Sequence, residues 1–117
     1  MPDSQKDFHK KLLGKVGEDL AVKFMKKLGY RLVKRNFTTP FGEADAIFTK
    51  DGVTVFVEVK TRTSTAYGDP KDAVGYKKRQ KYRKIAEYYA LKYGETPISF
   101  AVVEVIGDKV NLIENAF

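Results

Sequence analysis

The pattern of apolar and polar positions predicts a long helix at the start of the chain. Between residues 4 and 29, apolar side chains recur at helical spacing and would lie on one side of a helix. Ser4 is a suitable N-cap and Gly29 a suitable C-terminal stop. Glu18 falls at the edge of the apolar stripe, where its side chain either reaches inward or stays in solvent. The stripe consists of Leu13, Val16, Leu20, Ala21, Phe24 and Leu28.

Two glycines interrupt this helical pattern. Gly14 and Gly17 lie inside the helix rather than between a strand and a helix, and the chain has no GxxxxGK[ST] string. A phosphate-binding loop is therefore excluded. Glycines within helices more often permit close packing against a neighbouring element.

Alternating patterns predict three strands after the helix. The first two are joined by a loop over residues 38–42, and the second and third by a hairpin turn at Asp51-Gly52. The third strand is apolar on both faces, which is typical of the centre of a covered sheet. The strands span residues 30–37, 43–49 and 53–61.

The second and third strands contain charged residues, and each can be assigned to one face of the sheet because successive side chains of a strand point to opposite faces. Asp45 shares a face with Glu43 and Ile47, opposite the face of Ala44, Ala46 and Phe48. In the third strand, Glu58 and Lys60 share a face with Phe56, opposite four valines. Two acids and a lysine on adjacent strands are costly to bury unless they are paired or bind a metal.

The rest of the chain predicts a second helix and two more strands. A polar loop over residues 62–70 leads to a helix capped by Asp69 or Asp72 and closed by Gly94. Its apolar stripe is Val74, Tyr82, Ile85, Ala86 and Tyr89, and the last strands span residues 98–106 and 109–113. The order is α-β-β-β-α-β-β, and a helix crossing from the third strand to the fourth would make those two parallel.

The second helix also carries a basic run. Lys78 lies within its apolar stripe, so it either extends past the tyrosines to solvent or points at an anionic group near the sheet. Arg79, Arg83 and Lys84 lie on the outer face and suit phosphate contact, although such a run is often only a solvated face. Other basic residues of the candidate phosphate surface are Arg62, Lys77, Lys78 and Lys81.

Composition narrows the class of protein. The 117 residues fit one globular domain, residues 1–117, and the net charge of +7 favours an anionic partner, with nucleic acid ahead of a membrane. With no cysteine, disulfides, thiolate metal sites and a cysteine nucleophile are excluded. No apolar run is long enough for a transmembrane helix, and we expect a cytoplasmic protein.

The central strand pair can support phosphodiester hydrolysis. Asp45 and Glu58 supply hard oxygen ligands suited to Mg²⁺ or Mn²⁺, and the carbonyl of Val59 is a third candidate ligand. Lys60, among carboxylates, should stay protonated, orient the attacking water and stabilise charge. A buried ion pair between Lys60 and either acid is the structural alternative.

An acid, a short turn and then Glu-Val-Lys on an apolar strand resembles the PD-(D/E)xK nuclease superfamily, with its restriction-endonuclease-like fold. More closely, the strings FGEADAIF, VFVEVKTR, AYGDPKDAV and KKRQKYRKIAEYYA resemble the YraN family of small bacterial proteins. The similarity spans about Gly14 to Val105. The superfamily's proline before the aspartate is replaced by Ala44.

The resemblance implies roles for particular residues. Asp45 and Glu58 match metal-binding acids and Lys60 matches the catalytic lysine. Glu18 matches a helix glutamate that lies near the metal in related archaeal Holliday-junction resolvases. On this basis Glu18 and Lys78, which matches a lysine of the second helix, are expected to be catalytic residues, and Glu18 is also expected to bind the metal. Glu43, in the Gly-Glu-x-Asp string, is a supporting acid.

These observations lead to a primary hypothesis and two alternatives. The first is a Mg²⁺-dependent nuclease that acts on structured or branched DNA, with Holliday junctions as a candidate substrate and a two-fold dimer expected for paired cuts. The second is a non-catalytic nucleic-acid-binding protein that retains the nuclease fold. The weakest is a basic protein that docks to an acidic partner or ribosomal RNA.

Overall fold

A computed structural model describes residues 2–62, 75–115 and 117, with side chains described from Gly14 onward. Its element order is the predicted α-β-β-β-α-β-β, so the mixed α/β, restriction-endonuclease-like class is confirmed. The elements are α1 (Pro2–Lys27), β1 (Arg31–Thr39), β2 (Gly42–Lys50), β3 (Val53–Arg62), α2 (Tyr76–Tyr93), β4 (Ile98–Ile106) and β5 (Lys109–Glu114). The predicted caps Asp69 and Asp72, and Val74, lie outside the described residues.

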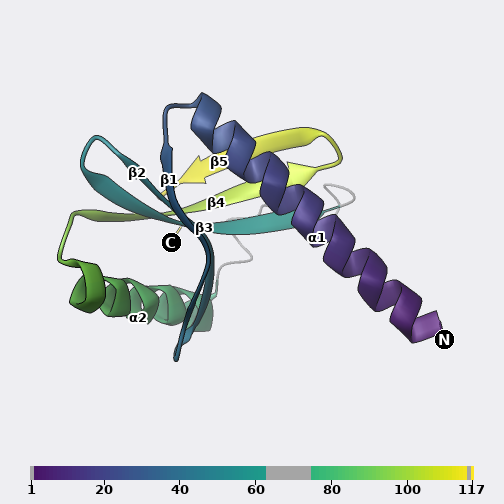
Figure 1. The fold of residues 1–117 in the computed structure, drawn as a ribbon, viewed down its shortest axis with the longest axis horizontal. Coiled ribbons are helices and arrows are strands. Elements are labelled where there is room, and N and C mark those ends of the chain that lie inside the picture. The colour runs from purple at the N-terminus through teal and green to yellow at the C-terminus, as the bar shows by residue number, and fades with distance from the viewer. Residues whose placement is uncertain (1, 63–74, 116) are drawn as a thin grey trace.

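The five strands form one sheet in the order β1-β2-β3-β4-β5. Neighbouring strands are antiparallel except β3 and β4, which are parallel as predicted. The two helices lie against opposite faces of this sheet (Figure 1). No helix in the described ranges is both long and apolar enough to span a membrane.

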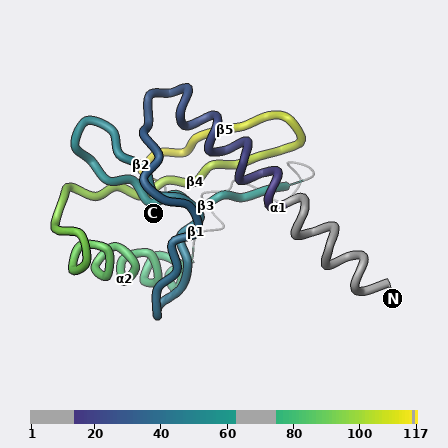
Figure 2. The backbone as a smooth tube through the Cα atoms, in the orientation of Figure 1, coloured from purple at the N-terminus to yellow at the C-terminus, as the bar shows by residue number. Residues whose placement is uncertain are grey.

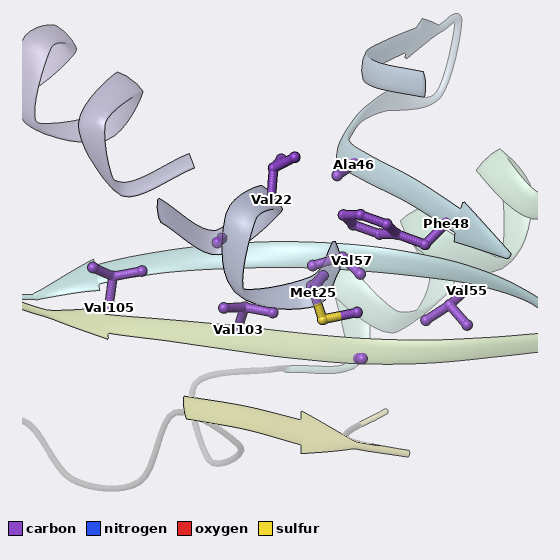
Figure 3. Packing of buried hydrophobic residues seen from close by; sticks show 10 residues of the cluster. Val22, Met25, Ala46, Phe48, Val55, Val57, Val103 and Val105 are labelled. Carbon is purple, nitrogen blue, oxygen red and sulfur yellow. The ribbon is translucent and has the colours of Figure 1, made fainter. Parts of the chain in front are cut away.

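Successive side chains of β3 point to opposite faces of the sheet, as predicted. Val55 and Val57 pack in the cluster under α1, whereas Phe56 packs in the cluster under α2. Figure 3 shows the first cluster, in which Met25 of α1 lies over the valines of β3 and β4. The face that carries Glu58 and Lys60 is therefore the face covered by α2.

The buried face of α1 differs from the predicted stripe. Ala21, Val22 and Met25 are buried against the sheet, while Val16 and Leu28 are exposed. At 100° per residue this is a rotation of roughly a quarter turn from the predicted stripe. Its physical cause is close helix–sheet contact through a glycine described below. Leu13 lies outside the described side chains.

Strand β2 breaks its own alternation near Asp45. Its pairing with β3 ends at Ala46 opposite Val57, while its pairing with β1 continues to Thr39 opposite Gly42. The β1–β2 hairpin thus leaves the sheet as a curved two-stranded arm that reaches past α2 (Figure 2). Ala44 consequently packs in the α2-side cluster, contrary to the predicted shared face with Ala46. The divergence leaves the edge of β3 unpaired with β2 beyond Val57.

Gly17 brings α1 into close contact with Thr61 of β3. A Cβ at Gly17 would lie 2.1 Å from Thr61 Oγ1, whereas a Cβ at Gly14 would meet nothing within 4 Å. We therefore expect opposite effects from the same substitution. Gly17→Ala should lower the free energy of unfolding by about 1–3 kcal/mol through overpacking, and Gly14→Ala should raise it by up to about 1 kcal/mol through helix propensity.

Urea unfolding of both variants checks this prediction. The double variant Gly17→Ala/Thr61→Ala, which removes the clashing hydroxyl, should recover part of the loss. Equal stabilisation by both glycine replacements would contradict the packing role of Gly17.

Candidate metal and catalytic site

Glu58 is held by side chains from α2. Lys78 Nζ donates to Glu58 Oε1 at 2.8 Å, and the Tyr82 hydroxyl donates to Oε2. Burial raises the pKa of the Glu58 carboxyl, but these two donors and the ammonium charges outweigh it and hold the pKa below its ordinary value. Glu58 is therefore an ionised carboxylate fixed at both oxygens. The inward orientation of Lys78 is the one that the resemblance favoured.

Asp45 directly precedes Ala46, the last β2 residue that pairs with β3. Its Oδ2 accepts a hydrogen bond from the Val59 N–H at 2.7 Å. Burial, and then the charges of Glu58, Glu18 and Glu43, raise the Asp45 pKa to about 6, although the Val59 hydrogen bond lowers it. Excess negative charge around a buried carboxyl is the electrostatic environment of a cation site.

The backbone of Val59 faces Asp45. The N–H and C=O of one strand residue point to the same side, so the Val59 carbonyl shares the side on which its N–H bonds Asp45. Because β2 has diverged there, a strand partner does not occupy this side. Asp45, Glu58 and the Val59 carbonyl are all hard oxygen donors, and this set fits Mg²⁺ or Mn²⁺.

Lys60 lies beside Glu58, with Nζ 3.9 Å from Glu58 Oε1. The adjacent Lys78, and then burial, lower the Lys60 pKa, against the opposing charge of Glu58. The prediction that Lys60 stays protonated considered only the carboxylates around it and did not include Lys78. Burial lowers the pKa of Lys78 too, but its bonds to Glu58 and Lys60 raise it above the ordinary value. Lys60 is thus the more readily deprotonated of the two ammonium groups.

The acids Glu18 and Glu43 lie near enough to Asp45 to affect its charge, but they do not form a metal site with it. Glu18 lies inward on α1, 3.7 Å from Arg35 Nη2, and burial raises its pKa despite that guanidinium. Glu43 is exposed and accepts a hydrogen bond from Thr38 Oγ1 at 3.4 Å. Among the described side chains, no three acidic or histidine residues are grouped closely enough to hold an ion. Glu18 and Glu43 act on Asp45 here through their charge.

Most of the basic residues predicted to contact phosphate are exposed to solvent on α2. The side chains of Lys77, Arg79, Arg83 and Lys84 are exposed, and Lys81 is half-buried. Arg62 differs, because its Nε lies 3.4 Å from Glu104 Oε2 and both side chains are only about one-tenth exposed (11% and 10%). The predicted role of Arg62 as a surface phosphate contact thus lacks the exposure of the α2 residues.

Two residues at the site were not predicted as part of it. Tyr82 was assigned to the core, where its ring is fully buried, but its hydroxyl reaches Glu58. Its position four residues after Lys78 places both on one helix face and was the available clue. Glu104 is buried and is the cross-strand partner of Lys60 on β4. Only knowledge of the parallel register places it there.

The fold and this geometry define an α/β domain with a carboxylate–lysine site between its central strands and one covering helix. The chain belongs to the uncharacterised protein family UPF0102, whose family model matches residues 17–105. That range contains all the site residues named above. The resemblance to the YraN family is thereby confirmed.

Curated relatives match along nearly their whole length. A UPF0102 protein of Thermodesulfovibrio yellowstonii is 42% identical over 106 residues, which cover 90% of this chain and 95% of the relative. One from Alkaliphilus oremlandii is 43% identical over 115 residues, covering 92% and 98%. One from Syntrophomonas wolfei is 45% identical over 114 residues, covering 90% and 96%. The matched part of this chain therefore corresponds to nearly the whole length of these relatives.

Proposed function

We propose that this protein is a Mg²⁺- or Mn²⁺-dependent nuclease that hydrolyses phosphodiester bonds of structured or branched DNA, with Holliday junctions among its candidate substrates. The observation that carries the proposal is the convergence of Asp45, Glu58 and Lys60 at the divergence of β2 from β3. The domain would belong to the PD-(D/E)xK superfamily, work in the cytoplasm and form a two-fold dimer on substrates that need paired cuts.

In this mechanism each residue has a separate task. Asp45, Glu58 and the Val59 carbonyl would hold the divalent cation, which supplies neutralisation of a phosphate oxygen and a more acidic water. Lys60 orients the attacking water and donates to the phosphate, where negative charge develops. Lys78 keeps Glu58 ionised and in position. The exposed α2 residues contact phosphates further along the backbone.

A cleavage assay tests the proposal. Labelled linear, flapped and four-way DNA are incubated with the protein and Mg²⁺ or Mn²⁺. Lys60→Ala should reduce the rate roughly 100- to 1,000-fold, the usual cost of removing one group that stabilises transition-state charge.

The matched control is Lys92→Ala, which removes an exposed lysine near the other end of α2 and should leave the rate unchanged. Cleavage that persists unaltered in Lys60→Ala and Asp45→Ala would exclude this site as the source of the activity.

One observation favours the alternative of a non-catalytic nucleic-acid-binding protein. Both oxygens of Glu58 are already hydrogen-bonded, to Lys78 and Tyr82. Such a protein would bind DNA in a salt-sensitive and metal-independent manner. It would cut none of the substrates, and Asp45→Ala would bind as tightly as the wild type.

A further inference from the structure

The tip of the β1–β2 arm presents an aromatic ring at a fixed position. Phe41 is 48% exposed at the turn. Its N–H donates to Thr39 Oγ1 at 3.0 Å, and the Thr39 hydroxyl donates to the Gly42 carbonyl at 2.8 Å. These bonds restrain the backbone of the turn from which the ring projects.

The same tip is docked on the basic flank of α2. Lys84 Nζ lies 5.5 Å from the centre of the Phe41 ring. The stem of Lys81 packs against Gly42 so closely that a Cβ there would lie 2.7 Å from Lys81 Cδ. Gly42 also has a φ of +134°, which favours glycine. The arm and the helix therefore present a continuous surface.

A second exposed aromatic residue lies at the start of the same helix. Tyr76 is 74% exposed and begins α2. Lys77, Lys81 and Lys84 follow at positions i, i+4 and i+7, so they share the flank that faces the arm. At 1.5 Å per residue, Tyr76 and Lys84 are about 12 Å apart along the helix. At 100° per residue, Tyr76 lies about 80° around the helix from Lys84, on the solvent side of this flank, so the surface runs from Phe41 across the lysines to the outer face of α2. We call these three lysines, with Phe41 and Tyr76, the aromatic–lysine stripe.

We propose that the aromatic–lysine stripe binds unpaired nucleotides beside the cleavage site, so that the substrate is DNA with a single-stranded arm. Single-strand binding surfaces combine aromatic rings, on which bases stack, with cations that follow the backbone. The separation of about 12 Å between Tyr76 and Lys84 along the helix axis equals the rise of about three or four stacked bases, at about 3.4 Å each. Phe41, in the turn directly before β2, is four residues from Asp45 along the chain, a distance of about 13 Å at strand spacing. This inference rests on the proposed nuclease function and specifies its substrate.

Binding measurements in the presence of chelator test the stripe without cleavage. Fluorescence anisotropy compares a blunt duplex with the same duplex carrying a single-stranded arm. Phe41→Ala and Tyr76→Ala should each weaken binding to the armed DNA roughly 5- to 100-fold, the range for loss of one stacked base. Binding to the blunt duplex should change little, because phosphate contacts dominate it.

Matched variants separate stacking from general surface effects. Phe41→Trp should retain the preference for armed DNA and Phe41→Leu should lose it, since leucine is apolar but has no π-face. Leu91→Ala removes a 90% exposed apolar residue elsewhere on α2 and should have no effect. A 2-aminopurine base in the arm should be quenched by the wild type and not by Phe41→Ala.

The outcomes distinguish the two proposals. If the wild type binds both DNAs equally, or if the stripe variants keep the preference, the stripe assignment is overturned and the nuclease proposal stands. If the wild type binds neither DNA, the nucleic-acid function itself is wrong and the stripe assignment falls with it.

Discussion

Replacing Asp45 with asparagine is expected to abolish cleavage and yet to stabilise the metal-free protein at neutral pH. Cleavage should fall roughly 100-fold or more, because the outer partners of metal ligands alone are worth roughly 10- to 100-fold. The asparagine keeps an oxygen acceptor for the Val59 N–H. The unfavourable negative charge at this position is lost.

The sign of the stability change follows from the Asp45 pKa. Its folded-state value of about 6 lies above its ordinary value of 3.8. The folded protein therefore binds this proton more tightly, and stability falls as the pH rises from about 4 to 6. Above that range the ionised Asp45 destabilises the fold by about 1–3 kcal/mol, discounted for partial solvent access. The Asp45→Asn substitution removes this penalty at a pH of about 7.5 and has little effect near pH 4.

Glu58→Gln is the matched comparison, and its stability change should have the opposite sign. Because the pKa of Glu58 is held low by its donors and nearby ammonium groups, its carboxylate stabilises the fold above its ordinary pKa, and this contribution is lost as the pH falls. Glu58→Gln should therefore lose both cleavage and stability at pH 7.5. Thermal unfolding in chelator at pH 4 and pH 7.5 gives the comparison. A destabilised Asp45→Asn at pH 7.5 would refute the assignment of excess charge to Asp45.

The core of this site is predictable from the sequence because strand alternation fixes faces. An Asp-Gly turn joins β2 to β3, so Asp45 had to lie near Glu58, and alternation put Lys60 on the same face. Helical periodicity likewise limited Lys78 to two orientations. These local rules need no knowledge of how the elements pack.

The structural features that the sequence patterns did not predict depend on packing between helices and strands. Periodicity finds a stripe on α1, but the Gly17–Thr61 contact decides which side of the helix approaches the sheet. Alternation along β2 gives no sign that the strand leaves β3 after Ala46. The ion pair between Arg62 and Glu104 arises from the parallel β3–β4 register, which no local pattern specifies.

The exposed cations and the two side chains that hold Glu58 belong to the same helix, α2. Lys78 and Tyr82 on the inner face of α2 hold Glu58, while Arg79 and Arg83 on its outer side are exposed. A backbone phosphate bound outside would thus restrain the helix that positions the carboxylate inside. Tyr82 is the more rigid of the two inner contacts, because its ring is fully buried and packs against Phe100 and Phe117.

Removal of the Tyr82 hydroxyl is expected to weaken Mn²⁺ binding roughly 10- to 100-fold, the usual effect of losing a group that orients a metal ligand. Tyr82→Phe preserves the ring and its packing, so the change is confined to the bond with Glu58 Oε2. Burial and the Glu58 charge raise the pKa of Tyr82, so its hydroxyl remains a donor at all working pH values. Each carboxylate oxygen has two lone pairs, so this bond orients Glu58 without excluding a cation.

Calorimetric titration with Mn²⁺ measures this effect independently of cleavage. Tyr89→Phe is the matched control, since Tyr89 lies on the same helix with its ring packed on Phe37 and Phe56. It should bind Mn²⁺ as the wild type does. Equal or tighter binding by Tyr82→Phe would mean that the hydroxyl competes with the cation or has no part in its site. Glu58 would then be positioned by Lys78 alone, and the salt dependence of Mn²⁺ binding should rise accordingly, because salt screens an ion pair, even a part-buried one, more than it screens a hydroxyl hydrogen bond.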